Sequence, residues 1–156
     1  MLSIIQAETA EHVTATRELF REYETWLNMS LCFQGFEEEL ATLPGKYAPP
    51  EGRLLLAYSD DNLAGCIALR ALNKDGVCEM KRLFVREGFR GQKIGVDLVQ
   101  RVIDDAREIG YSKMRLDTHP EKMGKAVELY RSHGFVEIPP YYENPHNGVL
   151  FMELAL

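Results

Sequence analysis

Hydrophobic residues recur at two different spacings along the chain. Over residues 9–27 and 94–109 they return every three or four positions, which is the spacing of one buried helix face. The same spacing over shorter stretches predicts helices at 36–43 and 121–132. Strands are predicted where short apolar runs lie between turn residues. These runs cover residues 2–5, 53–59, 63–72, 77–85, 113–118, 135–138 and 148–156.

The turns indicate how the strands connect. Residues 60–62 and 73–76 are short and polar, and such turns join antiparallel neighbours because a parallel connection needs a crossover of about a dozen residues or more. Residues 53–85 should therefore form an antiparallel meander, followed by strand, loop, helix, strand, helix and two strands. We expect one domain over 1–156 of the α/β (α+β) class. Its central sheet should be mixed, mostly antiparallel and flanked by helices.

Composition narrows the class of protein. With 46% hydrophobic and 27% charged residues among 156, the chain has the composition of an ordinary globular domain. No apolar run approaches the ~20 residues that span a bilayer, and five glutamates in the first thirty residues argue against a signal peptide. Three cysteines without a CxxC pair suit reduced thiols in a cytoplasmic protein. Four histidines without metal-ligand spacing lead us to expect no metal.

Charge is unevenly distributed along the chain. The net charge of −6 argues against a nucleic-acid partner. Residues 1–51 hold nine glutamates against three basic residues, whereas residues 81–93 hold five basic residues against one acid.

The basic segment adjoins a loop that enters the helix at 94–109. Such a loop presents unpaired N–H groups and the positive end of the helix dipole, which favour phosphate. Gly91 and Gly95 would let the backbone approach an anion, and Arg90 and Lys93 add positive charge. A Walker A loop is excluded because no GK[ST] occurs. The glycine spacing also does not fit GxGxxG, although Asp117 lies where a ribose-binding acid would stand.

Two segments carry a resemblance to a known family. Residues 89–99, FRGQKIGVDLV, resemble the acyl-CoA pyrophosphate loop of the GNAT superfamily of N-acetyltransferases. Arg90 and Gly95 match that motif, whereas Lys93 replaces its middle glycine. Residues 129–135, LYRSHGF, are similar to the LY..GF segment late in the same domain. The order of predicted elements agrees with that family over nearly the whole chain.

The resemblance implies an acyltransferase. An acetyl (acyl) group would pass from acetyl-CoA to a primary amine by direct attack in a ternary complex. Two alternatives stay open: a non-catalytic acyl-CoA-binding sensor of the same fold, and a dinucleotide-binding oxidoreductase domain. The implied pyrophosphate-binding residues are Arg90, Gly91, Gln92, Lys93, Ile94, Gly95 and Val96. The implied pantetheine-binding edge is the backbone of Leu83, Phe84 and Val85.

The same resemblance assigns catalytic roles. Glu79 would be the general base, with Lys81 on the same face of the strand, and Tyr130 would be the acid that protonates the departing thiolate. The loop before the last strand often borders the acceptor site in this family. Its candidate residues here are Tyr141, Tyr142, Asn144 and His146.

The charge distribution suggests the kind of acceptor. In similar proteins the first helices flank the acceptor cleft, so the acidic residues at 1–51 predict a cationic small-molecule or protein amine. On the same reasoning the basic run at 81–93 belongs to the cofactor. Dimers are common in the family, so the resemblance also implies a homodimer.

Overall fold

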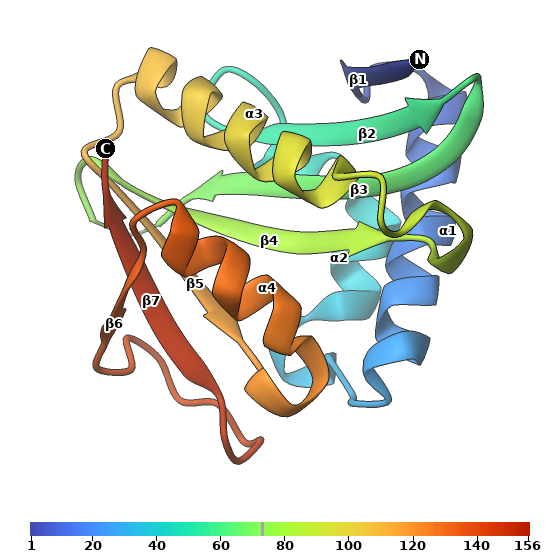
Figure 1. Cartoon of the computed structure of the whole chain (residues 1–156). Helices are drawn as coiled ribbons and strands as arrows, with labels where there is room; N and C mark the ends of the chain where they lie inside the picture. The colour runs from blue at the N-terminus through green and yellow to red at the C-terminus, as the bar shows by residue number, and fades with distance from the viewer. Residues whose placement is uncertain (73) are drawn as a thin grey trace.

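One mixed sheet organises the molecule. The computed structural model describes residues 1–72 and 74–156, without the side chain of Phe33. Seven strands pair in the order β1-β2-β3-β4-β5-β7-β6 (Figure 1). They are β1 (Leu2–Gln6), β2 (Arg53–Ser59), β3 (Asn62–Ala71), β4 (Val77–Val85), β5 (Lys113–Thr118), β6 (Val136–Ile138) and β7 (Leu150–Ala155). The β4–β5 pair is parallel, and the other neighbours are antiparallel, which confirms the predicted fold class.

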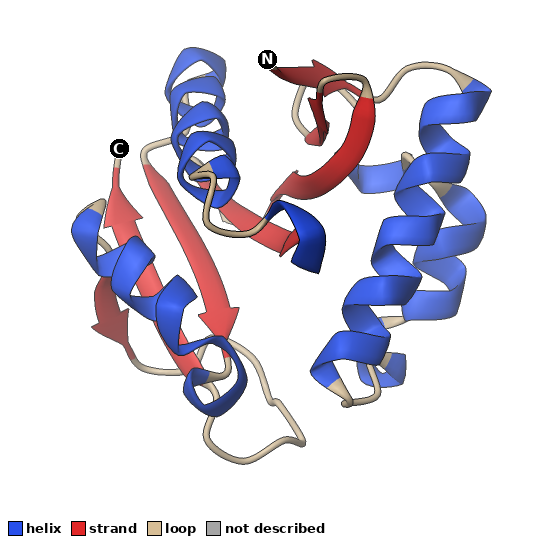
Figure 2. Cartoon of the chain, turned by 45° about the vertical axis from the view of Figure 1, so that its right-hand side comes forward, coloured by secondary structure: helices blue, strands red, loops and turns tan. Residues whose placement is uncertain are grey.

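Helices cover both faces of the sheet. They are α1 (Ala10–Leu27), α2 (Phe36–Thr42), α3 (Ile94–Ile109) and α4 (Pro120–Ser132), with short 3-10 helices η1 (Cys32–Gln34), η2 (Gly45–Tyr47) and η3 (Glu87–Phe89). Figure 2 shows α1 and α2 on one side of the strands and α3 and α4 on the other. The predicted boundaries are correct to within about two residues.

Each face has its own apolar core. The predicted face of α3 packs against the sheet and α4, and only Ile109 of that face is partly exposed. On the other face Leu19, Phe20 and Tyr23 of α1 pack against the strands. Thr9 caps α1, because its side chain accepts a hydrogen bond from the amide of His12. The sheet is thus held from both sides, and its geometry fixes the site described below.

A β-bulge interrupts β4 and changes which way its side chains point. Ala68 of β3 pairs with Lys81 and Cys66 pairs with Phe84, so β4 carries one extra residue. Arg82, at the bulge, has a φ of +62°, a left-handed conformation that is uncommon for a residue with a side chain. Lys81 and Arg82 consequently both contact the α1–α2 side, through Gln34 and Glu39 respectively.

Beyond the bulge β4 separates from β5. The two strands pair only over Val77–Glu79 and Lys113–Arg115, although β4 continues to Val85. Figure 1 shows the two strands diverging from there. A bulge increases local twist and bends the strand that carries it, which explains the divergence. The later half of β4 thereby keeps one backbone edge without a strand partner among the described residues.

Candidate functional site

The free edge of β4 leads directly into a site suited to an anion. No described side chain caps the N-terminus of α3, so the first amides of this helix are available to a ligand. Gly91 has a φ of +86°, and a Cβ built there would meet nothing within 4 Å. Loop residues 90–93 are exposed. Exposed amides at a helix N-terminus, beside a strand edge, fit a phosphate-bearing chain such as coenzyme A.

Lys93, which replaces the middle glycine of the pyrophosphate motif, has a backbone conformation that is typical of glycine. Its φ is +63°, so the residue occupies the left-handed region that glycine adopts most readily. Such a conformation costs roughly 1 kcal/mol or more for a residue with a side chain. The residue thus has the conformation that a glycine at this position would adopt readily, and its ammonium group adds positive charge to the loop.

The other predicted cofactor residues fall into two groups. Ile94 is 3% exposed and belongs to the core, so only its backbone can reach a ligand. Gly91, Gln92 and Val96 are exposed, and Gly95 is half-buried. The guanidinium of Arg90 lies 5.1 Å from the ring centre of Trp26, and its Nε donates to the carbonyl of Val85 at 3.0 Å. Leu83 and Val85 are partly buried, whereas the buried ring of Phe84 packs against Tyr23 and Trp26.

The structure corrects the interpretation of the basic run at 81–93. Arg82 forms a buried bidentate pair with Glu39, both bonds being 3.0 Å long. Arg86 pairs with Glu18 and Glu22 of α1 at 2.9 and 2.7 Å. These arginines face α1 and α2 because the bulge changes the alternation of side chains along β4. Only Arg90 and Lys93 of the basic run lie in the anion loop.

These ion pairs involve some of the glutamates in residues 1–51 from which a cationic acceptor is predicted. Glu18, Glu22 and Glu39 pair with β4 or its extension, and Glu37 pairs with Arg21 of α1. Four of the nine glutamates of residues 1–51 are thus paired within the protein, although most of the segment's net negative charge remains. None of the nine lines the cavities described below, so the predicted cationic acceptor rests on the charge count alone.

A narrow cavity lies where β4 leaves β5. Its volume is about 20 Å³, and its lining includes Lys81, Leu83, Asp117 and Tyr130. Tyr130 is 4% exposed, with its ring 5.8 Å from that of Phe135. Burial raises the pKa of the Tyr130 hydroxyl, so this group keeps its proton at neutral pH. Burial also raises the pKa of Asp117. A proton donor and a carboxylate of increased basicity therefore share one small space.

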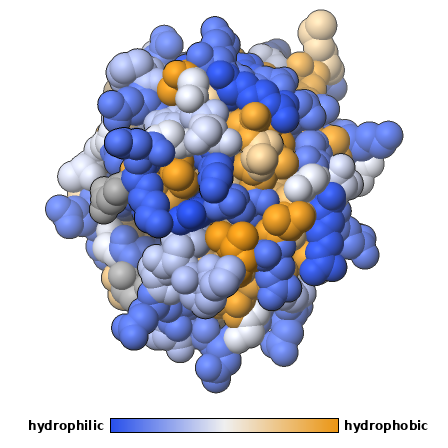
Figure 3. All heavy atoms as spheres, turned by 90° about the vertical axis from the view of Figure 1, so that its left-hand side faces the viewer, coloured by the Kyte–Doolittle hydropathy of each residue, from blue (hydrophilic) through white to orange (hydrophobic). Residues whose placement is uncertain are grey.

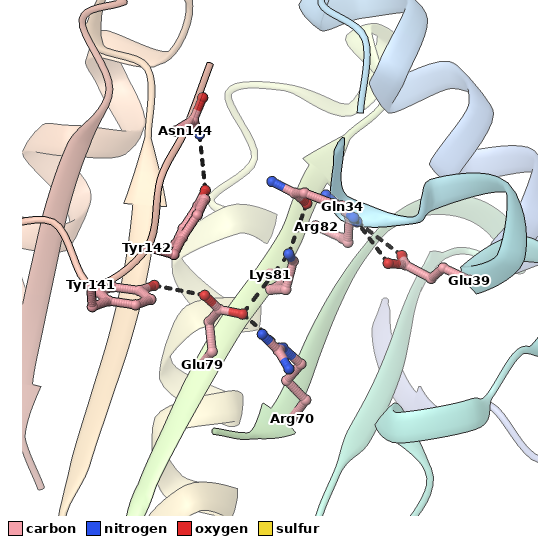
Figure 4. A network of polar contacts seen from close by, with 9 residues as sticks. All are labelled: Gln34, Glu39, Arg70, Glu79, Lys81, Arg82, Tyr141, Tyr142 and Asn144. Carbon is pink, nitrogen blue, oxygen red and sulfur yellow. Dashed lines mark hydrogen bonds and ion pairs between the residues drawn. The ribbon is translucent and has the colours of Figure 1, made fainter. Parts of the chain in front are cut away.

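Glu79 lies in a different environment, which Figure 4 shows. Its Oε1 accepts from Arg70 at 2.8 Å and its Oε2 accepts from the hydroxyl of Tyr141 at 2.7 Å. Lys81 lies 3.9 Å away and donates to Gln34 at 2.8 Å. Burial alone would raise the pKa of Glu79, but Lys81, Arg70 and the hydrogen bond from Tyr141 outweigh it and lower that pKa. Glu79 is therefore a well-satisfied carboxylate and a weak base.

The loop before β7 borders two cavities. Tyr141 and Tyr142 line the larger one, together with Glu79 and Lys81. Asn144 and His146 line a smaller one beside α1 and Asp117. The Nε2 of His146 lies 2.9 Å from the carbonyl oxygen of Ser30, so this loop reaches across to the segment after α1. The four loop residues predicted for an acceptor site thus all line cavities on the α1–α2 side.

Three site residues were not among the sequence-based candidates for this chemistry. The sequence suggests Asp117 only as a ribose-binding acid, and it indicates no role for Arg70 or Arg115. A signal was present in β5, where polar Lys113, Arg115 and Asp117 alternate with apolar Met114 and Leu116. That alternation places the three polar residues on one face of the strand. The sequence does not show that β5 pairs with β4, and this pairing places the three residues beside the cavities.

Some further features concern the described residues as a whole. Among them no helix is long and apolar enough to cross a membrane, and no cluster of three potential metal ligands occurs. Cys32, Cys66 and Cys78 are free thiols.

Comparisons with known proteins show the family to which the chain belongs. An uncharacterized N-acetyltransferase of Schizosaccharomyces pombe is 40% identical, over 99% of this chain and 95% of its own length. One from Dictyostelium discoideum is 37% identical, over 96% and 97%. The crystal structure of the PaiA N-acetyltransferase of Thermoplasma acidophilum in complex with coenzyme A superposes with a TM-score of 0.75 at 19% identity, covering 100% of this chain and 99% of that one. The model of the acetyltransferase (GNAT) family matches residues 11–135. The chain is therefore an acyltransferase that belongs to the GNAT family.

Proposed function

We propose that this enzyme transfers an acetyl group from acetyl-CoA to a primary amine within a ternary complex. The observation that carries the proposal is the unpaired edge of β4, which runs from the cavity of Tyr130 to the uncapped N-terminus of α3. The structural neighbour from Thermoplasma holds coenzyme A, which supports the same cofactor here. The backbone of Leu83–Val85 would hold the pantetheine arm. The amides of residues 90–96 and the side chains of Arg90 and Lys93 would hold the pyrophosphate.

Tyr130 is proposed as the general acid. As the amine nitrogen forms its bond to the carbonyl carbon, the carbon–sulfur bond breaks and the sulfur gains negative charge. The hydroxyl of Tyr130 is buried and protonated, and it would give its proton to this sulfur. A backbone N–H of β4 near Phe84 or Val85 would stabilise the negative oxygen.

Asp117 is proposed as the group that takes the proton from the amine. It shares the cavity of Tyr130, and its raised pKa makes it the stronger base of the two carboxylates. The role of Glu79 as the base, implied by family resemblance, remains a competing prediction. Its contacts with Arg70 and Tyr141 suit a positioning role in the neighbouring cavity.

The test compares Tyr130→Phe, Asp117→Asn and Glu79→Gln in a thiol-release assay with acetyl-CoA and a panel of amines. Tyr130→Phe and Asp117→Asn should each lower kcat by about 100-fold or more, with coenzyme A binding unchanged. Asp117→Asn should also remove the acidic limb of the pH–rate profile. If Glu79→Gln removes that limb and Asp117→Asn keeps it, the base is Glu79.

The same assay decides between catalysis and the two alternatives. Coenzyme A binding without turnover on any amine would indicate a sensor of the same fold. Binding of NAD without binding of coenzyme A would indicate the dinucleotide-binding interpretation. A cytoplasmic location, which the free cysteines suggested, stays a prediction to be checked by fractionation.

A further inference from the structure

A cavity with a volume of about 760 Å³ lies on the α1–α2 side of β4 and β5. The β6–β7 loop covers it with Tyr141 and Tyr142, and Lys81 connects it to the cavity of Tyr130. Figure 3 shows that the side of the molecule on which β6 and β7 end the sheet is mostly hydrophilic. A substrate in the large cavity could thus present one end to Tyr130 and Asp117.

The lining of this cavity is strongly cationic. Its positive residues are Lys46, Arg70, Lys74, Lys81, Lys113 and Arg115. Against these six stand three carboxylates, those of Glu79, Glu143 and Glu153. The whole chain carries a net charge of −6, so a positive excess of three in one cavity runs against the overall balance. A ligand that carries only positive charge would be repelled there.

The floor of the cavity is a row of charged residues on neighbouring strands. Arg70 pairs in register with Glu79, Glu79 with Arg115, and Arg115 with Glu153. Each arginine donates through its Nε to the adjacent glutamate at 2.8 Å. Opposite charges on paired strands stabilise such a row and fix its side chains.

The two arginines of this row retain donors for a ligand. Each guanidinium has five N–H donors, and no described residue is bonded to the terminal nitrogens of Arg70 or Arg115. The guanidinium of Arg115 also lies 5.3 Å from the ring centre of Tyr141, which orients its plane. Both oxygens of Glu79 are already occupied by Arg70 and Tyr141. An arginine held through Nε, with its other nitrogens available, is suited to bind an oxyanion in a bidentate manner.

We infer that the acceptor amine carries an oxyanion, a carboxylate or a phosphate, which binds Arg70 and Arg115 while its amine points toward Lys81 and Asp117. The inference rests on the proposed acetyl transfer and names the class of substrate. It replaces a cationic acceptor with a zwitterionic or anionic one. Leu72, Ile138 and the two tyrosines would contact the body of the substrate.

Matched acceptor pairs test this directly. Each L-amino acid is compared with the amine that lacks its carboxylate, and phosphoethanolamine is compared with ethanolamine. The oxyanion-bearing member of a pair should have a kcat/KM at least about tenfold higher, the effect of one charge-assisted bond. The amino-acid pairs and the phosphoethanolamine pair distinguish a carboxylate site from a phosphate site. A preference for the decarboxylated amines or for polyamines would overturn the inference.

Variants locate the anion. Arg70→Gln and Arg115→Gln should each raise KM for the oxyanion-bearing acceptors about tenfold. They should leave KM for acetyl-CoA and for the decarboxylated amines unchanged. Lys125→Gln, an exposed charge on α4, serves as the matched control. An equal loss on both members of each acceptor pair would show a merely structural role and refute the assignment.

A binding experiment separates this inference from the proposed function. Calorimetry measures binding of N-acetyl amino acids, which carry the carboxylate but need no turnover, to the wild type and to Arg70→Gln. Binding that depends on Arg70 without any acetyl transfer would refute the proposed function and retain the anion site. Acetyl transfer without binding that depends on Arg70 would do the opposite.

Discussion

Two charged regions of this molecule use the same residue types for different ends. In the closed region, between β4 and helices α1 and α2, Arg82 and Arg86 are paired with glutamates on the helices. In the open region, the large cavity beyond Glu79, basic side chains outnumber acidic ones by two to one. Residues of β4 contribute to both regions. The two regions meet at the bulge, where the alternation of side-chain directions along β4 changes.

The difference shows that charge along a chain and charge in a cavity are separate quantities. The run of basic residues next to the anion loop predicts that these residues bind the cofactor. In the folded protein, however, Arg82 and Arg86 pair with glutamates of the helices. The cavity instead collects its cations from separate segments, including Arg70 of β3 and Arg115 of β5. The neighbours of a charged side chain in the folded protein therefore determine whether its charge stabilises the fold or is available to a ligand.

The closed region should respond most strongly to the loss of one partner. Glu39→Ala leaves the guanidinium of Arg82, whose side chain is 3% exposed, without its counter-charge. We expect the free energy of unfolding to fall by about 3–5 kcal/mol. Urea denaturation measures it, with the exposed neighbour Glu38→Ala as control. A loss below about 1 kcal/mol would mean that Arg82 reaches water and that the region is not closed.

Lys81 lies between the two regions and should show a pH effect. Burial, followed by the charge of Arg82, lowers its pKa to about 8. Between this value and the unfolded value near 10.4 the unfolded chain binds more protons, so stability should rise with pH. We expect a gain of roughly 1–2 kcal/mol from pH 8 to 9.5 that is absent in Lys81→Met. Urea denaturation at several pH values checks this, and parallel curves for both proteins would refute it.

Arg86 tests the partly exposed edge of the closed region. It pairs with Glu18 and Glu22, whose side chains are 61% and 37% exposed. Because water and salt screen such pairs, Arg86→Gln should cost about 1 kcal/mol or less. Thermal unfolding at low and high salt measures the effect, which should shrink as salt increases. A cost as large as that of Glu39→Ala would remove the distinction between buried and exposed pairs.

The open region should show the smallest effect on stability. Lys46 lines the cavity, is exposed, and has no ion-pair partner among the described residues. Lys46→Gln should change the free energy of unfolding by no more than about 0.5 kcal/mol. It should nevertheless raise KM for oxyanion-bearing acceptors two- to threefold, or about 0.5 kcal/mol of binding free energy. Loss of stability with an unchanged KM would place Lys46 with the structural charges.

Much of the fold could be predicted because its patterns are local. The periodic apolar face of α3, the polar turns of the meander and the glycine-marked loop each lie within one segment. The predicted roles of Tyr130 and of residues 83–85 and 90–96 are compatible with the structure, which brings Tyr130 and Leu83 to one cavity. Their roles in catalysis and cofactor binding stay predictions until the assay above is done.

What could not be predicted depends on pairing between distant segments. Strict alternation would place Lys81 and Arg82 on opposite faces of β4, and only the bulge brings both to the α1–α2 side. The row from Arg70 to Glu153 arises because four strands align in register. The low basicity of Glu79 follows from Arg70, Lys81 and Tyr141, and Tyr141 is 62 residues away along the chain.

The bulge also limits how this sequence can change. Beyond it, Gly65 pairs with Val85, and a Cβ on Gly65 would lie 2.5 Å from the carbonyl oxygen of Phe84, so residue 65 must lack a side chain while this strand pairing persists. Arg82 in turn adopts its left-handed conformation beside Glu39, which holds its guanidinium. Positions 39 and 82 therefore depend on each other, whereas position 65 is constrained by the backbone of Phe84. A library that varies residue 39 or 82 alone leaves a buried charge without its partner, whereas joint variation of the two positions can replace the pair with side chains that fit together.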